Sequence, residues 1–443
     1  MNKTAVIIGG GLAGVEAAIQ LARRDINVLL YEMKPKKFSP AHKSEGLAEL
    51  VCSNSFKAER LESAAGLLKA EMQLLESVSV ECALQSRVPA GGALAVDREA
   101  FSALMTKKVE ENPNIRLIRE EVTDIPSADA VIIAAGPLAS EALSKTISDI
   151  CGTSASGDGM LSFYDAAAPV ISADSIDMER AFTGSRYGRG GDSDYINCPL
   201  NKEEYELFHH ELINAKSAML HEFDVYEGCM PIEVLAKRGL DAIRYGPMKP
   251  VGLTDPKTGG RAWAVLQLRR ENLSGTMYNL VGFQTNLKFA EQKRVFSLIP
   301  ALKNAEFERF GVMHRNSFIN SPRLLKTSFA LRERPDLFFA GQITGVEGYM
   351  ESAASGIMAG INAARLLRGE EPLILPNITM TGALAEYVCA ENKNFQPMGA
   401  TFGLLPPLDV KIRDKRERYA ALAERSLNLL KQVIVNILLL QRR

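Results

Sequence analysis

Several familiar signatures are absent from this 443-residue sequence. Lys plus Arg number 52 and Asp plus Glu number 53, so the net charge is −1 and the overall field of the protein does not favour a polyanion. A nucleic-acid site would therefore have to be a local patch. No stretch offers eighteen uncharged apolar residues, so we expect no membrane span. The final run, residues 426–443, is interrupted by Lys431, Gln432 and Asn436, and predicts a terminal helix docked on the body.

Closely spaced cysteines are also missing. No two of the six lie closer than thirty residues, which excludes a C-x-x-C redox pair and the spacing of a zinc site, so we predict no metal. The N-terminal apolar run is too short for a signal-peptide core, and we expect a cytoplasmic protein with reduced thiols. Most of the cysteines are then expected to be small buried hydrophobes. They are Cys52, Cys82, Cys151, Cys198, Cys229 and Cys389.

The most informative segment is "KTAVIIGGGLAGVEAAIQLARRDINVLLYEMK", residues 3–34. A β-branched run is followed by Gly9, Gly11 and Gly14 in G-x-G-x-x-G spacing, a helical pattern and a second strand that ends at Glu32. Gly9 would allow a tight turn, Gly11 would let the backbone approach a pyrophosphate, and Gly14 would let helix and strand pack closely. The phosphates would lie at the helix N-terminus, and Glu32 would accept hydrogen bonds from ribose hydroxyls. The segment predicts a dinucleotide site.

A second glycine-rich segment lies near the other end of the chain. Residues 336–367 read as a strand, a turn containing Gly341 and Gly348, and a long helix whose small residues permit close approach to something large and flat. Residues 128–138 read as another buried strand. This arrangement resembles the glutathione-reductase-like FAD fold and implies FAD. No second G-x-G-x-x-G follows a strand, so NAD(P)H would visit transiently.

The fold class that we predict is α/β, a FAD-binding Rossmann domain with an inserted α+β domain. The FAD domain would span residues 1–154 and 306–443, including C-terminal helices, and the inserted substrate domain residues 155–305. Within the latter, "RAWAVLQLRRE" and "GTMYNLVGFQT" flank a turn-forming "NLSG" and predict a hairpin. Residues 67–76 and 99–111 read as helices. Asp97 and Arg98 lie at its start, where Asp97 can be an ordinary N-cap and the segment can also cover the cofactor.

Four further positions are candidates for chemistry. Cys52, in "ELVCSNSF", is followed by polar residues that could stabilise a thiolate, and Cys229 precedes the predicted start of a helix at Pro231, where a thiol pKa falls. Taken alone, each of the two is also consistent with a buried structural cysteine. Lys249, between two prolines, is either a functional cation or part of a stiff surface turn. His314 lies on a predicted strand end beside Arg315 and Asn316.

Seven segments together resemble the folate- and FAD-dependent tRNA uracil-5-methyltransferases, in family order over nearly the whole chain. They are "PAHKSEGLAELVCSNSF", "RVPAGGALAVDRE", "YEGCMPIEVLAKRG", "YGPMKPVGL", "GFQTNLKFAEQKR", "GVMHRNSFIN" and "GVEGYMESAASG". The resemblance implies that methylenetetrahydrofolate supplies the methyl carbon of ribothymidine in the tRNA T-loop, and that reduced FAD, recharged by NAD(P)H, supplies the electrons. It also implies that Cys52 and Cys229 are the functional thiols, with Cys52 as nucleophile, and that His314 stacks on the folate.

Other interpretations remain open at this stage. A generic NAD(P)H-dependent flavin oxidoreductase, a wobble-uridine-modifying flavoprotein and a non-catalytic FAD-stabilised RNA-binding protein share parts of the pattern. Basic clusters at residues 33–37 and 411–426 are candidates for tRNA contact, although such runs are usually solvated faces. The sequence does not indicate the oligomeric state.

Overall fold

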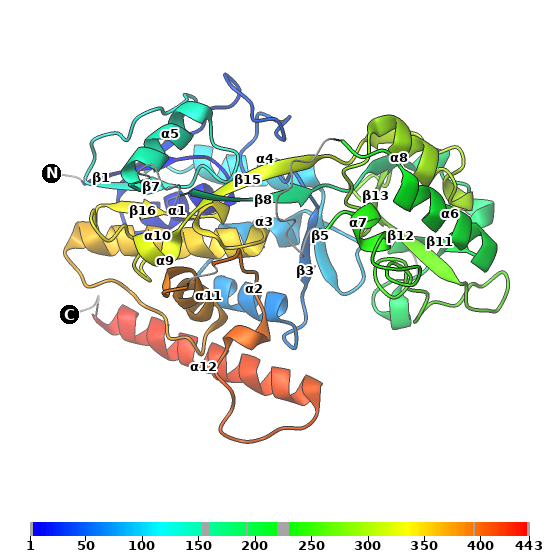
Figure 1. The fold of residues 1–443 in the computed structure, drawn as a ribbon. Helices are drawn as coiled ribbons and strands as arrows, with labels where there is room; N and C mark the ends of the chain where they lie inside the picture. Colours follow the sequence, from blue (N-terminus) through cyan, green and yellow to red (C-terminus); the bar gives the residue numbers. More distant parts are fainter. Residues whose placement is uncertain (1–2, 153–159, 192–193, 219–229, 393–394, 441–443) are drawn as a thin grey trace.

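The structure is a computed structural model that describes residues 3–152, 160–191, 194–218, 230–392 and 395–440. Figure 1 shows two bodies, with a ribbon of two long strands running between them. The first body contains both chain ends and a parallel sheet covered by helices. The second body is formed by the middle of the chain.

The first sheet is parallel throughout and has β1 at its centre. Its strands, in spatial order, are β16 (Leu337–Phe339), β7 (Ala130–Ile133), β1 (Thr4–Ile8), β2 (Asn27–Tyr31) and β6 (Ile115–Ile118). Ile8 is in register with both Tyr31 and Ile133, so the carboxyl ends of three strands meet at one edge. The predicted strands at both ends of the chain are therefore confirmed, and they pair in one sheet.

Helices α1 (Leu12–Ala22) and α10 (Tyr349–Arg368) pack closely against each other through two glycines of α10. A Cβ atom on Gly356 would lie 2.2 Å from the carbonyl oxygen of Ala13, and one on Gly360 would lie 2.8 Å from Cα of Ala17. The small residues of α10 therefore approach another helix. The expectation that they make room for a large flat molecule is corrected by this contact.

The second body is built on a six-stranded antiparallel sheet with its own apolar core. Its strands, in spatial order, are β10 (Phe182–Thr183), β11 (Tyr195–Leu200), β12 (Ala264–Arg270), β13 (Met277–Leu280), β9 (Val170–Ser172) and β14 (Phe307–Arg309). Its helices are α6 (Lys202–Asn214), α7 (Ile232–Ala236) and α8 (Phe289–Phe296). The pairing of β12 with β13 confirms the predicted hairpin.

Two smaller strand groups lie between the bodies. Strands β8 (Met160–Ala166) and β15 (Met313–Ile319) form the connecting antiparallel ribbon (Figure 1). Strands β3 (Ser55–Ala58), β5 (Ala93–Val96) and β4 (Arg87–Val88) form a three-stranded sheet. The chain therefore crosses from one body to the other beside the segment that contains Cys52.

The remaining helices surround the first sheet. They are α2 (Ala64–Leu74), α3 (Val78–Gln85), α4 (Arg98–Glu110), α5 (Glu141–Ile150), α9 (Ser321–Leu324), α11 (Met380–Cys389) and α12 (Lys415–Leu440). The helices predicted near 67–76 and 99–111 are confirmed as α2 and α4. Helix α12 docks on the body through buried Ser426 and Leu430, as expected for the terminal segment. Within the described ranges, every helix is too short or too polar to cross a bilayer.

A buried carboxylate joins three of these helices. Glu71 of α2 accepts hydrogen bonds from the backbone N–H groups of Met380 and Thr381 (2.7 and 2.8 Å) and from the hydroxyls of Thr381 and Ser426. Burial raises the pKa of Glu71, while these hydrogen bonds lower it. The N-terminus of α11 and the middle of α12 are thus tied to α2 by one side chain.

We expect Glu71→Ala to destabilise the protein by about 3 kcal/mol, because it leaves several buried donors without an acceptor. Chemical denaturation measures the change. The matched control is Glu110→Ala, which removes an exposed glutamate from α4 and should change the free energy of unfolding by less than about 0.5 kcal/mol. Equal effects of the two substitutions would contradict the role given to Glu71.

Candidate functional site

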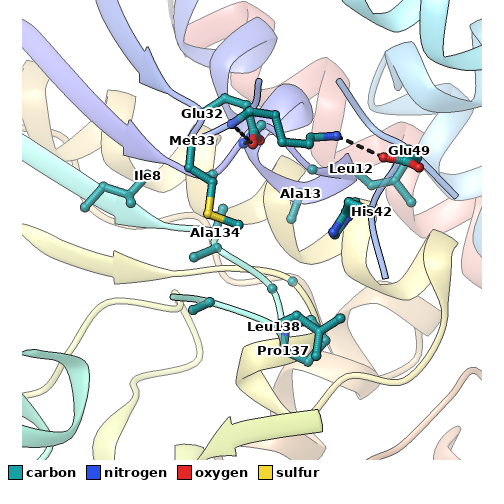
Figure 2. Close-up of a pocket in the computed structure, with 18 of the residues that line it drawn as sticks. Ile8, Leu12, Ala13, Glu32, Met33, His42, Glu49, Ala134, Pro137 and Leu138 are labelled. Atoms are coloured by element: carbon teal, nitrogen blue, oxygen red, sulfur yellow. Dashed lines mark hydrogen bonds and ion pairs between the residues drawn. The ribbon is translucent and has the colours of Figure 1, made fainter. Parts of the chain in front are cut away.

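A cavity lies at the carboxyl edge of the parallel sheet, where ligands of open α/β folds bind. Figure 2 shows Glu32 and His42 on one side of it, with Pro137 and Leu138 facing them. Its lining comes from residues 8–13, 31–34, 120–122, 134–140 and 341–342, together with Leu143, Tyr349, Ser352 and a few residues of the segment 42–51. Both glycine-rich turns therefore contribute to one cavity.

The first turn has the shape that its glycines predict. Gly9 has a φ of +108°, and a Cβ there would lie 2.5 Å from the carbonyl oxygen of Ala134. A Cβ on Gly14 would lie 1.9 Å from the carbonyl oxygen of Gly9. Gly11, by contrast, has nothing within 4 Å of its Cβ position, and it begins α1 without a side-chain cap. The N-terminus of α1 is thus open toward the cavity, where it favours an anion.

Glu32 is buried at the end of β2 and lines the cavity. Its carboxylate accepts hydrogen bonds from the backbone N–H groups of Gly10 (2.9 Å) and Lys34 (3.0 Å). A carboxylate has about four acceptor positions, so two remain for a ligand hydroxyl. Glu32 therefore holds the glycine turn in place and can also bind a ribose.

The two glycines of the later turn have different surroundings. Gly341 lines the cavity with a φ of +86°, and its N–H donates to Ser355 Oγ (2.7 Å). Gly348 caps α10 at a φ of +119°, and its Cβ position lies 2.2 Å from a carboxylate oxygen of Glu351, which pairs with Lys57 (2.9 Å). Gly341 is therefore placed at the cavity, whereas Gly348 shapes the start of α10 beside it.

Cys52 lies directly beside the cavity. Its backbone N–H donates to the hydroxyl of Tyr349 (2.8 Å), and both Tyr349 and Val51 line the cavity. The thiol is half-buried, with Sγ 3.7 Å from the carbonyl oxygen of Ala166 on β8. Burial raises the pKa of the Tyr349 phenol, so this hydroxyl stays protonated as it accepts that hydrogen bond.

Arg98 does not line this cavity. Its guanidinium donates to the carbonyl oxygens of Leu50 and Cys52 and pairs with Glu271 of the second body. Asp97 caps α4 by accepting from the N–H of Ala100 (3.0 Å), which confirms the N-cap interpretation. Arg98 therefore contacts the chain around Cys52, and its predicted contact with a cofactor stays a prediction.

The other described cysteines are buried, as expected for structural residues. Burial raises the pKa of the thiols of Cys82, Cys151 and Cys389 to about 12, and that of Cys198 further. None of these four thiols is suited to act as a thiolate near neutral pH. Cys229 lies outside the described residues, two positions before the Pro231 cap of α7.

His314 is the second residue of strand β15. It is in register with Asp165, next to the pair formed by Met313 and Ala166. Because Ala166 also contacts the sulfur of Cys52, the backbone of His314 lies close to the Cys52 segment. The strand prediction for this segment is confirmed.

The basic positions have neighbours that sequence patterns do not reveal. Lys34 is buried and pairs with Glu49 (3.2 Å), while Lys36 and Lys37 pair with glutamates of residues 120–121. Lys249 is exposed, and its carbonyl oxygen accepts from Arg186. The cluster at 33–37 is thus largely neutralised. In the described chain no group of acidic, histidine and cysteine residues is arranged to hold a metal.

Tyr349 and His42 are cavity residues that the sequence did not single out. Tyr349 follows the glycine turn as the first residue of α10. Its position directly after Gly348 could have indicated that it lies at the cavity. His42 lies in an irregular segment that belongs to the family resemblance, but nothing in that segment marked this residue as part of a cavity. Its place at the cavity depends on how the segment folds back over β2.

The parallel sheet and its cavity assign the protein to the Rossmann-type dinucleotide-binding folds. The glucose-inhibited division protein A family model matches residues 4–371. The methylenetetrahydrofolate–tRNA-(uracil-5-)-methyltransferase TrmFO of Acetivibrio thermocellus is 56% identical over 432 residues, covering 97% of this chain and 98% of the relative. The enzyme of the same name from Enterococcus faecalis is 55% identical over 441 residues, covering 99% and 100%. The chain therefore belongs to this family and groups within it with the tRNA (uracil-5-)-methyltransferases.

A solved structure supports the fold independently. Aquifex aeolicus GidA in its form II crystal aligns with a TM-score of 0.68 over 98% of this chain and 76% of that chain, at 17% sequence identity. At this identity the similarity concerns the fold alone. It confirms the prediction of an α/β fold with a Rossmann-type domain.

We expect Gly11→Ala to fold like the parent protein but to bind FAD, the dinucleotide predicted from the sequence, at least about tenfold more weakly. The Cβ position is sterically open, so only a ligand that approaches the backbone would contact the added methyl group. Thermal unfolding and FAD titration measure the two properties. Gly92→Ala is the matched control, since its Cβ position is also open and lies away from the cavity. Unchanged FAD affinity in Gly11→Ala would place the ligand elsewhere.

Proposed function

We propose that this protein methylates carbon 5 of a uracil in the T-loop of tRNA and so forms ribothymidine. Methylenetetrahydrofolate would be the carbon donor, FAD the bound cofactor and NAD(P)H the reductant. The observation that supports this most strongly is the position of Cys52 in a chain of this family: it follows Val51 and is hydrogen-bonded to Tyr349, and both of these residues line the cavity. A reactive thiol next to a redox cofactor is what this chemistry requires.

The residues present fit FAD. Glu32 is placed to bind the adenosine ribose, and the open N-terminus of α1 at Gly11 is placed to bind the pyrophosphate. Gly341 and Tyr349 extend the cavity toward the Cys52 segment. When bound, FAD would supply the reducing equivalents and carry the one-carbon unit, because a flavin can do both.

Cys52 would act on the uracil itself. Carbon 5 of uracil is a weak nucleophile until a group adds at carbon 6. The thiolate sulfur would form a bond to carbon 6, and the electron pair of the 5,6 double bond would move onto the carbonyl oxygen as an enolate. Carbon 5 of that enolate would then form a bond to the one-carbon unit. The bond between this unit and its carrier would break, and the unit would become a methyl group by taking up the reducing equivalents that bound FAD supplies. Loss of the proton from carbon 5 and departure of the sulfur would restore the double bond.

Two further roles belong to the same proposal. Cys229 would act as an acid or base or protect the flavin, and His314 would stack on the folate. The domain division at residues 154–155 and 305–306 would place the uracil between the FAD body and the inserted body. The target base must leave the stack of the T-loop to reach Cys52, and phosphate contacts would make tRNA binding sensitive to salt.

The direct test supplies the purified protein with unmodified tRNA transcript, methylenetetrahydrofolate and NAD(P)H. We expect ribothymidine at one T-loop uridine, detected by nucleoside mass spectrometry, and no product when either the folate or the reductant is omitted. A protein that retains FAD but yields no ribothymidine would reject the proposed function.

Cys52→Ala should abolish product formation, by roughly a thousandfold or more, while FAD content and thermal stability stay close to those of the parent protein, because the thiol is half-buried. Cys151→Ala is the matched control. It removes a buried thiol from the end of α5 and should lower stability by about 1 kcal/mol without affecting turnover. Near-normal turnover of Cys52→Ala would exclude Cys52 as the nucleophile.

A further inference from the structure

The segment from Leu50 to Asn54, here called the Cys52 loop, is held by side chains from both bodies. From the first body, Arg98 donates to the carbonyl oxygens of Leu50 and Cys52, and Tyr349 accepts from the N–H groups of Cys52 and Ser53. From the second body, the contact is made by Arg269 on β12. The position of the thiol therefore depends on the packing of the two bodies.

Arg269 makes two hydrogen bonds to the Cys52 loop. Its Nε donates to Asn54 Oδ1 (2.9 Å), and a terminal nitrogen donates to Ser53 Oγ (3.0 Å). Asn54 in turn donates to the carbonyl oxygens of Val96 and Arg270, each at 2.9 Å. Asn54 is fully buried and Arg269 is 7% exposed, so these bonds are shielded from water. Ser53 and Asn54, the two residues that follow Cys52, are therefore held in a fixed polar network.

The surroundings of the Cys52 loop are rich in positive charge. The guanidinium groups of Arg98, Arg269 and Arg309 all lie near the Cys52 loop. The carboxylate of Glu271 pairs with Arg98 and with Arg309 (3.1 Å to the latter). Burial lowers the pKa of Arg269, whereas Tyr195, Glu271 and a Cys52 thiolate raise it. The interaction is mutual, so a guanidinium that is stabilised by the thiolate also stabilises the thiolate. Arginine keeps its charge in this setting.

We propose that Arg269 is a positioning residue for Cys52. From the second body it fixes the loop through Ser53 and Asn54 and supplies a positive charge that favours the thiolate. The inference rests on the proposed function for the importance of the thiolate. The other charged or titratable groups around the loop and Arg269 are Arg98, Arg309, Glu271, Tyr349 and Tyr195.

The test measures the rate at which iodoacetamide alkylates Cys52 in the full-length, FAD-loaded protein, as a function of pH, with peptide-resolved mass spectrometry. We expect Arg269→Met to slow alkylation at pH 7 about tenfold and to move the midpoint of the profile upward by about one pH unit. Arg269→Lys retains the charge and should remain within about threefold of the parent protein. A merely structural role would not separate the Met and Lys variants in this way.

Arg270→Met is the matched control. Arg270 is the next residue of β12, and its side chain points to the opposite face of the sheet. Its substitution should leave the alkylation profile of Cys52 unchanged. An Arg269→Met protein that binds FAD and alkylates like the parent would overturn the proposal, as would an equal effect of the Arg270 variant.

If Arg269→Met does not fold, Ser53→Ala tests the proposal in its place. It removes one acceptor of Arg269 from the loop and should slow alkylation about threefold, whereas an unchanged rate overturns the proposal. Alkylation does not require tRNA or folate. If the parent protein forms no ribothymidine but Arg269→Met shifts the alkylation profile, the proposed function is rejected and the role of Arg269 is supported. If the parent protein forms ribothymidine but the profile of Arg269→Met is unshifted, the proposed function is supported and the role of Arg269 is rejected.

Discussion

The contact on which the rest of the structure depends is the close packing of α1 against α10. Gly356 and Gly360 of α10 leave room for the backbone of Ala13 and Ala17, and any larger residue there would separate the helices. This contact brings residues from the two ends of the chain to one edge of the sheet. Gly341 and Tyr349 can line the same cavity as the first glycine turn only because α10 is held at that distance.

A second constraint follows at the Cys52 loop, where the two bodies meet. Asp97 caps α4 with one carboxylate oxygen and accepts from the N–H of Leu273 in the β12–β13 turn with the other (2.9 Å). The next residue, Arg98, pairs with Glu271. Asp97 and Arg98, which begin helix α4 in the first body, therefore also hold the second body in place. A thiol that must meet both a cofactor and a large substrate is suitably placed at such a junction.

Local patterns predicted much of the fold and part of the site. The strand, glycine turn and helix at residues 4–22, the hairpin around residue 273 and the Asp97 cap depend on neighbours in the sequence, and the structure confirms each. The surroundings of Cys52 depend on distant residues, since its contacts Tyr349 and Ala166 lie 297 and 114 positions away. The ion pair of Arg98 with Glu271 was not predicted for the same reason, because no local pattern reveals a partner that is 173 positions away. The roles of the individual site residues remain predictions.

The central claim is that the dinucleotide cavity and the Cys52 thiol form one site. A crystal structure of the FAD-loaded protein tests it most directly. The account predicts that FAD fills the cavity with its ribose at Glu32 and its pyrophosphate at the start of α1, and that the Cys52 sulfur borders the same cavity as the flavin ring. FAD bound at another edge of the sheet, or a Cys52 sulfur separated from the flavin by the chain, would contradict it.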